Sequence, residues 1–196
     1  MRTRSARGLV VAGLLAVACA AAAVEYRVDP AETRAGFEVT FLGVIPIRGE
    51  FSRVSGTLRF DDGQETGGVD IVIDATSLAG GGATARGKDF FHVARYPVIE
   101  FHSSRFLFEQ GRLKQVEGKL TLTGQRHPVT LDMHAVTCDA RMPPQPRRCR
   151  ADAEVTVKRN RFGMTGWAMS VSDDVTIRIR LAAIEIAPAA SAAVPQ

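Results

Sequence analysis

The sequence predicts an all-β protein of about eight antiparallel strands. Apolar and polar residues alternate with a period of two through most of the chain from Val24 onward, which is typical of strands with one buried and one solvated face. Turn segments rich in glycine and proline separate these stretches, and no long segment has a helical period. Because an antiparallel sheet with one apolar face must cover that face, we expect either a closed barrel or a sandwich of two sheets.

The predicted strands follow one another with turn signals between them. Apolar residues such as Val175 and Ile177 lie on one face of a strand, with polar or charged residues on the other. A turn is expected over residues 43–49, and Asp61-Asp62-Gly63 is typical of a hairpin turn because Asp-Gly tolerates positive φ. The predicted strands are residues 35–41, 51–60, 69–74, 99–108, 118–123, 129–135, 151–157 and 175–181.

Residues 86–101 (RGKDFFHVARYPVIEF) interrupt the alternation with two adjacent rings, Phe90 and Phe91. A residue before proline is biased away from helical backbone, so any helical turn here should end at Tyr96. We therefore predict a short helical segment near residues 86–94. It would cover one end of the β-structure, above a cavity for an apolar ligand.

Residues 1–23 have the composition of a cleaved signal peptide. Three arginines precede an apolar run over residues 9–18 that is too short to span a bilayer, and three alanines at 21–23 offer a cleavage site. The mature domain would then cover residues 24–186, followed by a disordered Ala/Pro tail over residues 187–196. Lipidation at Cys19 is the disfavoured alternative, because Ala16 stands where lipoprotein signals usually have leucine.

The charge of the mature chain argues against nucleic acid as a partner. The precursor carries +4, and the predicted signal peptide holds three arginines and no acidic residue, which leaves +1 (4 − 3). The basic character of the precursor therefore comes largely from the leader.

Cys138 and Cys149 flank a proline-rich loop. In an oxidising compartment they either pair with each other or stay free, and we favour the disulfide. A zinc site is disfavoured, because no further Cys or His stands at ligand spacing to complete a tetrahedral set.

The sequence offers no recognisable catalytic machinery. It contains neither a Gly-x-Ser-x-Gly elbow nor a phosphate-binding glycine loop, and its four histidines form no metal-binding pair. We therefore predict no catalytic residues, no metal and no cofactor. Two groups remain candidates for contact with a ligand head group: His92, and the basic cluster of Lys158, Arg159 and Arg161, which could equally be a solvated turn.

Several stretches, in this order, resemble the YceI family of periplasmic polyisoprenoid-binding proteins. They are residues 88–104 (KDFFHVARYPVIEFHSS), 118–133 (GKLTLTGQRHPVTLDM), 157–166 (VKRNRFGMTG) and 171–185 (VSDDVTIRIRLAAIE). The similarity runs from about Tyr26 to Ile186. The glycines at 80–82 and the loop between the two cysteines depart from the family pattern.

The resemblance implies an elongated, lipocalin-like antiparallel barrel with an apolar tunnel. Such a periplasmic protein would hold a polyisoprenoid, an isoprenoid quinone or another long-chain amphiphile, for storage, shielding or transport. The expected partners are this lipid, transiently a membrane or membrane protein, and a second copy in a homodimer. Two alternatives stay open: an enzyme acting on an isoprenoid or quinone in the same pocket, and a filled barrel that serves as an interaction protein.

The predicted ligand-binding residues combine the apolar strand faces with residues of the resembling motifs. They are Phe37, Val39, Phe41, Phe51, Leu58, Phe60, Ile71, Ile73, Phe90, Phe91, Ile99, Phe101, Leu120, Leu122, Val129, Leu131, Phe162, Met164, Trp167, Val175, Ile177 and Ile179. Each could instead be ordinary core, so the tunnel rests on the resemblance more than on these side chains.

Overall fold

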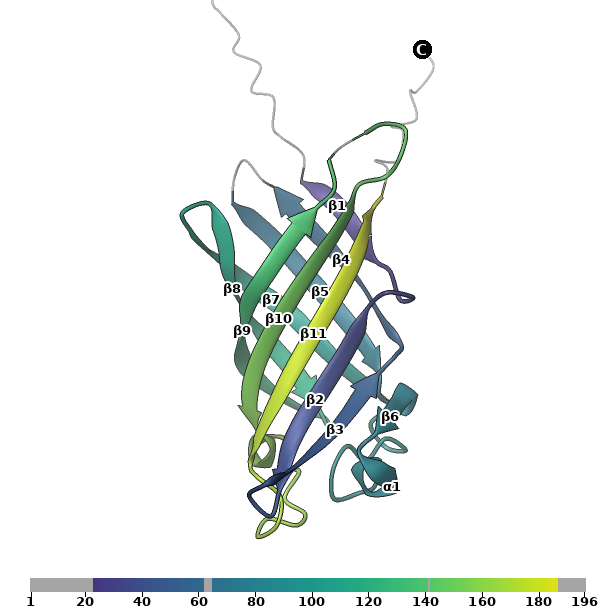
Figure 1. Ribbon diagram of the computed structural model, residues 1–196, viewed down its shortest axis with the longest axis vertical. Helices are drawn as coiled ribbons and strands as arrows, with labels where there is room; N and C mark the ends of the chain where they lie inside the picture. The colour runs from purple at the N-terminus through teal and green to yellow at the C-terminus, as the bar shows by residue number, and fades with distance from the viewer. Residues whose placement is uncertain (1–22, 62–64, 141, 187–196) are drawn as a thin grey trace, which may run out of the picture.

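The strands form an elongated antiparallel barrel (Figure 1). The computed structural model describes residues 23–61, 65–140 and 142–186. Residues 1–22 of the predicted signal peptide, residues 62–63 of the predicted hairpin turn and the predicted tail over 187–196 lie outside the described residues.

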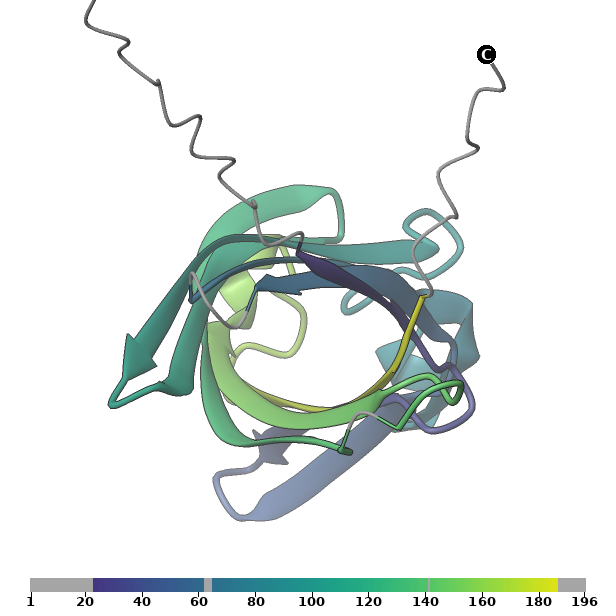
Figure 2. The same ribbon diagram turned by 90° about the horizontal axis from the view of Figure 1, so that it is seen from above.

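Eight strands close the ring, and the predicted all-β barrel is confirmed. Neighbours in the ring are hydrogen-bonded, and the last strand pairs back to the first, as Figure 2 shows from above. In ring order the strands are β1 (Val24–Val28), β4 (Val54–Asp61), β5 (Thr66–Asp74), β7 (Val98–Glu109), β8 (Arg112–Leu122), β9 (Gln125–Cys138), β10 (Arg148–Lys158) and β11 (Asp174–Glu185).

Two strands share the outer edge of β11. The short β1 pairs with its last residues, and β2 (Arg34–Phe41) pairs with its first half, up to Arg180. Thr33, fully buried at this change of partner, exchanges hydrogen bonds with the backbone of Ala182: its Oγ1 accepts from the N–H at 3.0 Å and donates to the carbonyl at 3.2 Å. Beyond β2, β3 (Ile45–Phe51) and β6 (Leu78–Gly80) extend the wall at the lower end.

A β-bulge explains a change of phase that is visible in the sequence of β7. Ile99 and Phe101 are buried, and then the apolar positions shift to Phe106 and Phe108. The pairing of β7 with β8 slips by one residue between Ser103 and Arg105. Because one extra residue reverses the facing of all later side chains, both apolar sets point into the barrel.

The helical segment predicted near residues 86–94 was wrong in position. Helix α1 covers Gly82–Ala85, and a series of turns follows it. The N–H of Phe91 bonds the Ala85 carbonyl at 3.0 Å, and His92 has φ 44°, which ends any helical turn. The other helical elements are 3₁₀ turns, η1 (Ala75–Ser77) and η2 (Arg159–Phe162). Within the described ranges, no helix has the length and apolarity that a bilayer crossing requires.

The turn predicted over residues 43–49 was also wrong. The turn is at residues 42–44, and β3 then runs through Pro46 to Phe51, so the strand predicted over 51–60 is interrupted before β4. Pro46 lies on a sheet edge, because β6 pairs only with the last three residues of β3. Gly49 is needed for packing: a Cβ there would lie 2.4 Å from the ring of Phe37.

Asp74 connects the end of β5 to the segments around it. Its carboxylate accepts a hydrogen bond from Arg53 Nε at 2.8 Å and others from the backbone and hydroxyl of Thr76 at 2.8 and 2.6 Å. The hydrogen bond from Arg53, followed by those from Thr76, lowers the pKa of Asp74 to about 2. The carboxylate therefore stays ionised in mildly acidic solution.

We expect Asp74→Asn to reduce the acid dependence of stability. Because the folded pKa of Asp74 is depressed below its unfolded value, its contribution is present above about pH 4 and is lost as pH falls towards about 2. The contribution at neutral pH should be about 1 kcal/mol or less, since the Asp74 side chain is 40% exposed. Urea unfolding across this pH range measures it. Asp152→Asn, at an exposed position on β10, is the control; equal pH profiles for D74N and wild type would contradict the assignment.

Candidate ligand cavity

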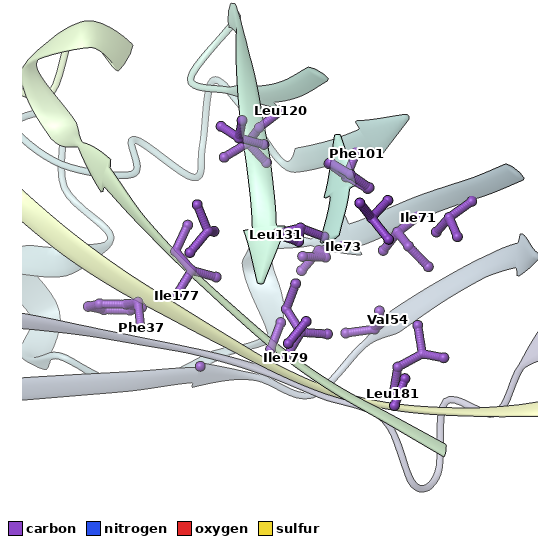
Figure 3. A pocket seen from close by; sticks show the side chains of 18 of the residues that line it. Phe37, Val54, Ile71, Ile73, Phe101, Leu120, Leu131, Ile177, Ile179 and Leu181 are labelled. Carbon is purple, nitrogen blue, oxygen red and sulfur yellow. The ribbon is translucent and has the colours of Figure 1, made fainter. Parts of the chain in front are cut away.

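An apolar cavity of about 900 Å³ occupies the interior of the barrel. Figure 3 shows ten labelled side chains, from β2, β4, β5, β7, β8, β9 and β11, around this space. Its volume is typical of a pocket for a small organic ligand. Several wall residues, such as Ile177 and Ile179, are only partly buried although they face inward, because the cavity leaves their inner surfaces uncovered.

The predicted ligand-binding residues line this cavity with one exception. Those in its wall are Phe37, Val39, Phe41, Phe51, Leu58, Phe60, Ile71, Ile73, Phe90, Phe91, Ile99, Phe101, Leu120, Leu122, Val129, Leu131, Met164, Trp167, Val175, Ile177 and Ile179. Whether each contacts a ligand stays a prediction. Phe162 is outside the wall: it is 1% exposed, and its ring packs edge-on against His127 with centroids 5.0 Å apart.

Aromatic rings close the lower end. The ring of Phe91 lies 5.0 Å from that of Phe37 and 5.3 Å from that of Phe51, and all three side chains are buried. We call this the closed end, defined by Phe37, Phe51, Phe91 and Arg159. The segment that carries Phe90 and Phe91 follows α1 beside the lower end of the barrel (Figure 1).

A buried arginine organises the closed end. Arg159 is 3% exposed, and its guanidinium donates to the backbone carbonyls of Ser172, Met164, Gly166 and Val171 at 2.6–3.1 Å. The guanidinium carbon also lies 5.6 Å from the centre of the Phe90 ring. Burial lowers the pKa of Arg159, and nearby Asp173 partly opposes this. The Arg159 side chain thus holds the loop over residues 163–173 against the closed end of the cavity.

The basic cluster considered from the sequence does not act as a unit. Lys158 pairs with Asp174 at 2.7 Å, Arg159 is buried as described, and Arg161 is exposed outside the cavity wall. His92 does not line the cavity either; its ring packs edge-on against Tyr96, with centroids 5.7 Å apart. Among the described residues, no group of three or more His, Cys, Asp or Glu is arranged to hold a metal.

The upper end of the cavity is open to solvent. Most wall residues there are exposed, including Val136 at 46%, whereas the four residues that define the closed end are buried. Trp167, in the loop held by Arg159, is a wall residue that is 53% exposed. We call this end the mouth, defined by Arg59, Arg112, Lys114, residues 134–138, Arg147, Cys149 and Arg150.

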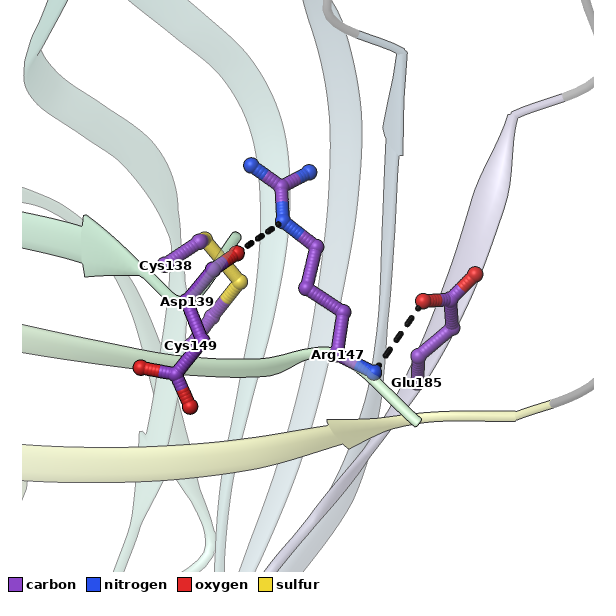
Figure 4. Close-up of a disulfide and its surroundings, with 5 residues drawn as sticks. All are labelled: Cys138, Asp139, Arg147, Cys149 and Glu185. Atoms are coloured by element: carbon purple, nitrogen blue, oxygen red, sulfur yellow. Dashed lines mark hydrogen bonds between the residues drawn. A yellow bond between two sulfur atoms is a disulfide. The ribbon is translucent and has the colours of Figure 1, made fainter. Parts of the chain in front are cut away.

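The disulfide predicted between Cys138 and Cys149 is confirmed and lies at the mouth (Figure 4). The two cysteines face each other across β9 and β10, at the base of the proline-rich loop. Arg147 Nε donates to the Asp139 carbonyl at 3.1 Å, and the Arg147 backbone N–H donates to Glu185 Oε2 at 3.3 Å. The bridge therefore fixes the spacing of two strands where the cavity opens.

Cationic side chains dominate the charge around the cavity. Of its described wall residues, six carry a positive charge and one a carboxylate. The cations are Arg59, Arg112, Lys114, Arg147, Arg150 and Arg159, and the carboxylate is Glu100. Sequence reasoning missed the five cations of the mouth. In the sequence these five residues are indistinguishable from solvated charges at strand ends. Only the arrangement of the strands in the barrel shows that they surround an opening.

The fold and the sequence agree with one family. Residues 26–183 match the YceI-like domain. The chain belongs to the YceI-like family. A UPF0312 protein of Yersinia pestis is 28% identical over 193 residues, covering 95% of this chain and all of that protein. Among solved structures, Burkholderia cenocepacia BcnA superposes with a TM-score of 0.66 at 25% identity, covering 79% of this chain and 98% of BcnA.

A further solved structure, described as a polyisoprenoid-binding domain from Saccharophagus degradans, has the same fold. Its TM-score is 0.57 at 15% identity, over 83% of this chain and 99% of that domain. The YceI-like match lies within the domain predicted over residues 24–186, and the cavity described above lies inside that fold.

We expect Arg159→Leu to loosen the closed end of this YceI-like barrel. The substitution leaves four backbone carbonyls without their donor, which should lower the free energy of unfolding by about 2–4 kcal/mol. Trp167, the single tryptophan, lies in the same loop, so its emission reports the release while urea unfolding gives the stability. Arg159→Lys should recover part of the loss. Wild-type stability and emission in R159L would contradict this role.

Loss of the disulfide should destabilise the folded protein by up to about 3 kcal/mol, because the bridge closes a loop with a sequence separation of 11. We expect Cys138→Ser/Cys149→Ser to unfold at lower urea concentration than the oxidised wild type, and the reduced wild type to resemble the double variant. Urea melts with and without reductant measure both, with thiol alkylation as the control for complete reduction. Equal midpoints for oxidised and reduced protein would exclude a stabilising bridge.

Proposed function

We propose that this YceI-like protein holds one polyisoprenoid, isoprenoid quinone or other long-chain amphiphile inside the barrel, as a store or carrier. The apolar cavity, whose wall includes residues of both the mouth and the closed end, carries the proposal. The likeness to a structure described as a polyisoprenoid-binding domain supports the ligand class. The alternative hypothesis, an interaction protein with a filled barrel, predicts no such cavity.

The dimensions of the barrel suit a long chain. Strand β11 has 12 residues, which at about 3.3 Å per residue and a tilt of about 40° gives a barrel height of about 30 Å. Burying each CH₂ contributes about 0.8 kcal/mol, so fifteen groups contribute about 12 kcal/mol. This matches the estimated cost of association, about 4–15 kcal/mol, and a longer chain gives a surplus. Chain length should therefore decide affinity more than any single hydrogen bond.

The proposal places the mature protein in the periplasm. The leader-like composition of residues 1–23 and the disulfide both suit an exported protein, because disulfides persist in oxidising compartments. A ligand of this class dissolves poorly in water, so loading would involve transient contact with a membrane or a membrane protein. Cleavage of the leader, rather than lipidation at Cys19, remains a prediction, and so does a homodimer.

Lipid extraction tests the ligand class directly. The protein would be expressed with its leader, purified from the periplasm without detergent, and extracted for mass spectrometry. We expect about one long-chain amphiphile per protein molecule. Repeated recovery of folded protein without a stoichiometric lipid would overturn the proposal.

Filling the cavity should weaken binding. Val69 lines the cavity, so Val69→Trp places an indole in the space that a ligand would occupy. Displacing even two CH₂ groups of a ligand would raise its Kd about tenfold. Val72→Trp is the matched control, because Val72 lies on the same strand but is exposed on the outer face. Displacement of a neutral fluorescent probe such as N-phenyl-1-naphthylamine by geranylgeraniol measures both. Equal Kd values for the two variants would show that the ligand does not occupy this part of the cavity.

A further inference from the structure

Strands β8 and β9 separate as they approach the mouth. Their last paired residues are Gln115 and Asp132, whose side chains are joined by a 2.8 Å hydrogen bond from Gln115 Nε2. Beyond this pair, residues 112–114 of β8 stay with β7 and residues 133–138 of β9 stay with β10. Figure 1 shows the β7–β8 hairpin leaning away from the upper end of β9. Both separated segments line the cavity, so the mouth continues into an opening between these two strands.

The β8 side of this opening carries two unpaired cations. Arg112 and Lys114 are exposed and line the cavity, and neither side chain has an acidic partner among the described residues. Lys114 is the extra residue of a bulge: its neighbours Leu113 and Gln115 lie opposite Phe108 and Leu107, which are consecutive. By contrast, two other cations of the mouth are engaged.

The engaged cations are Arg59, which lies 3.7 Å from Glu25, and Arg150, which lies 3.0 Å from Glu32. At the closed end Arg159 is saturated by backbone carbonyls and covered by Phe90. A charged head group would lose its hydration at the closed end, whereas at the mouth it stays in contact with water. The charges thus favour one orientation of a bound amphiphile.

We propose that Arg112 and Lys114 form a head-group subsite for a phosphorylated amphiphile, with its chain in the cavity and its tail towards Phe91. This inference rests on the proposed function and adds the chemistry of the head group. An arginine fork and a lysine ammonium are suited to phosphate oxygens. The opening between β8 and β9 gives the head group room beside the two side chains.

The test compares two ligands that differ only in the head group, geranylgeranyl phosphate and geranylgeraniol. Each displaces the neutral probe from protein stripped of lipid, at low ionic strength, and inorganic phosphate is run in parallel. The variant is R112Q/K114Q. The control, K119Q/R161Q, removes the same charge from two exposed residues outside the cavity wall. Thermal melts of both variants should match the wild type, because all four side chains are exposed.

We expect the wild type and the control to bind the phosphate about tenfold more tightly than the alcohol, as two screened ion pairs would give. This preference should fall with added salt. In R112Q/K114Q the two Kd values should converge through weaker binding of the phosphate alone. Inorganic phosphate should displace no probe, because the subsite acts together with the chain.

Three results would overturn the subsite. They are a wild type without preference for the phosphate, an R112Q/K114Q variant that keeps the preference, and a variant that loses both ligands equally. In each of these cases geranylgeraniol still binds the wild type, so the proposed function stands. If neither amphiphile displaces the probe from the wild type, the proposed function fails, and the subsite fails with it.

Discussion

An antiparallel sheet has two edges with unpaired backbone groups, and the whole structure depends on how this chain removes them. The outer edge of β11 is longer than β1 can cover, so β1 takes its final residues and β2 takes the rest. Thr33 makes this division possible, because its hydroxyl bonds both backbone groups of Ala182 at the change of partner. The result is a ring of eight strands with an additional wall of β2, β3 and β6 around the closed end.

Closure at this strand number leaves more room than the side chains fill. The closed end is packed by aromatic rings and by the carbonyl network of Arg159, whereas the middle and the mouth remain hollow. The charge of the wall changes along the same axis: the single cation of the closed end, Arg159, is engaged by backbone carbonyls, whereas the mouth carries five cations. Under the proposed function, shape, packing and charge would therefore all favour the same direction for a long molecule with one polar end. The disulfide contributes by fixing β9 and β10 at the upper rim.

Alternation was sufficient to predict β2, β4, β5 and β7 to β11, and the inward faces of residues such as Ile71 and Phe101, because a half-buried strand must repeat every two residues. Strands β1, β3 and β6 were not predicted. It was insufficient wherever local and tertiary signals conflict. Pro46 and Gly49 suggested a turn, yet one lies on a sheet edge and the other makes space for Phe37. Phe162 was predicted from the sequence to line the cavity, but its side chain packs outside it. Arg112 and Lys114 became visible as a pair only when the divergence of β8 from β9 was known.

The described chain both begins and ends at the rim of the mouth. Val24 pairs with Phe60, which lines the cavity, and the N–H of Ile186 bonds the carbonyl of Glu25 at 2.8 Å. The closed end carries no chain terminus of the described domain (Figure 1). A tether could be attached at either terminus, for example an uncleaved leader in a bilayer or a fused protein. Such a tether would hold the mouth, rather than the closed end, near the attachment point. The order of the strands therefore determines which end of the barrel faces a tether.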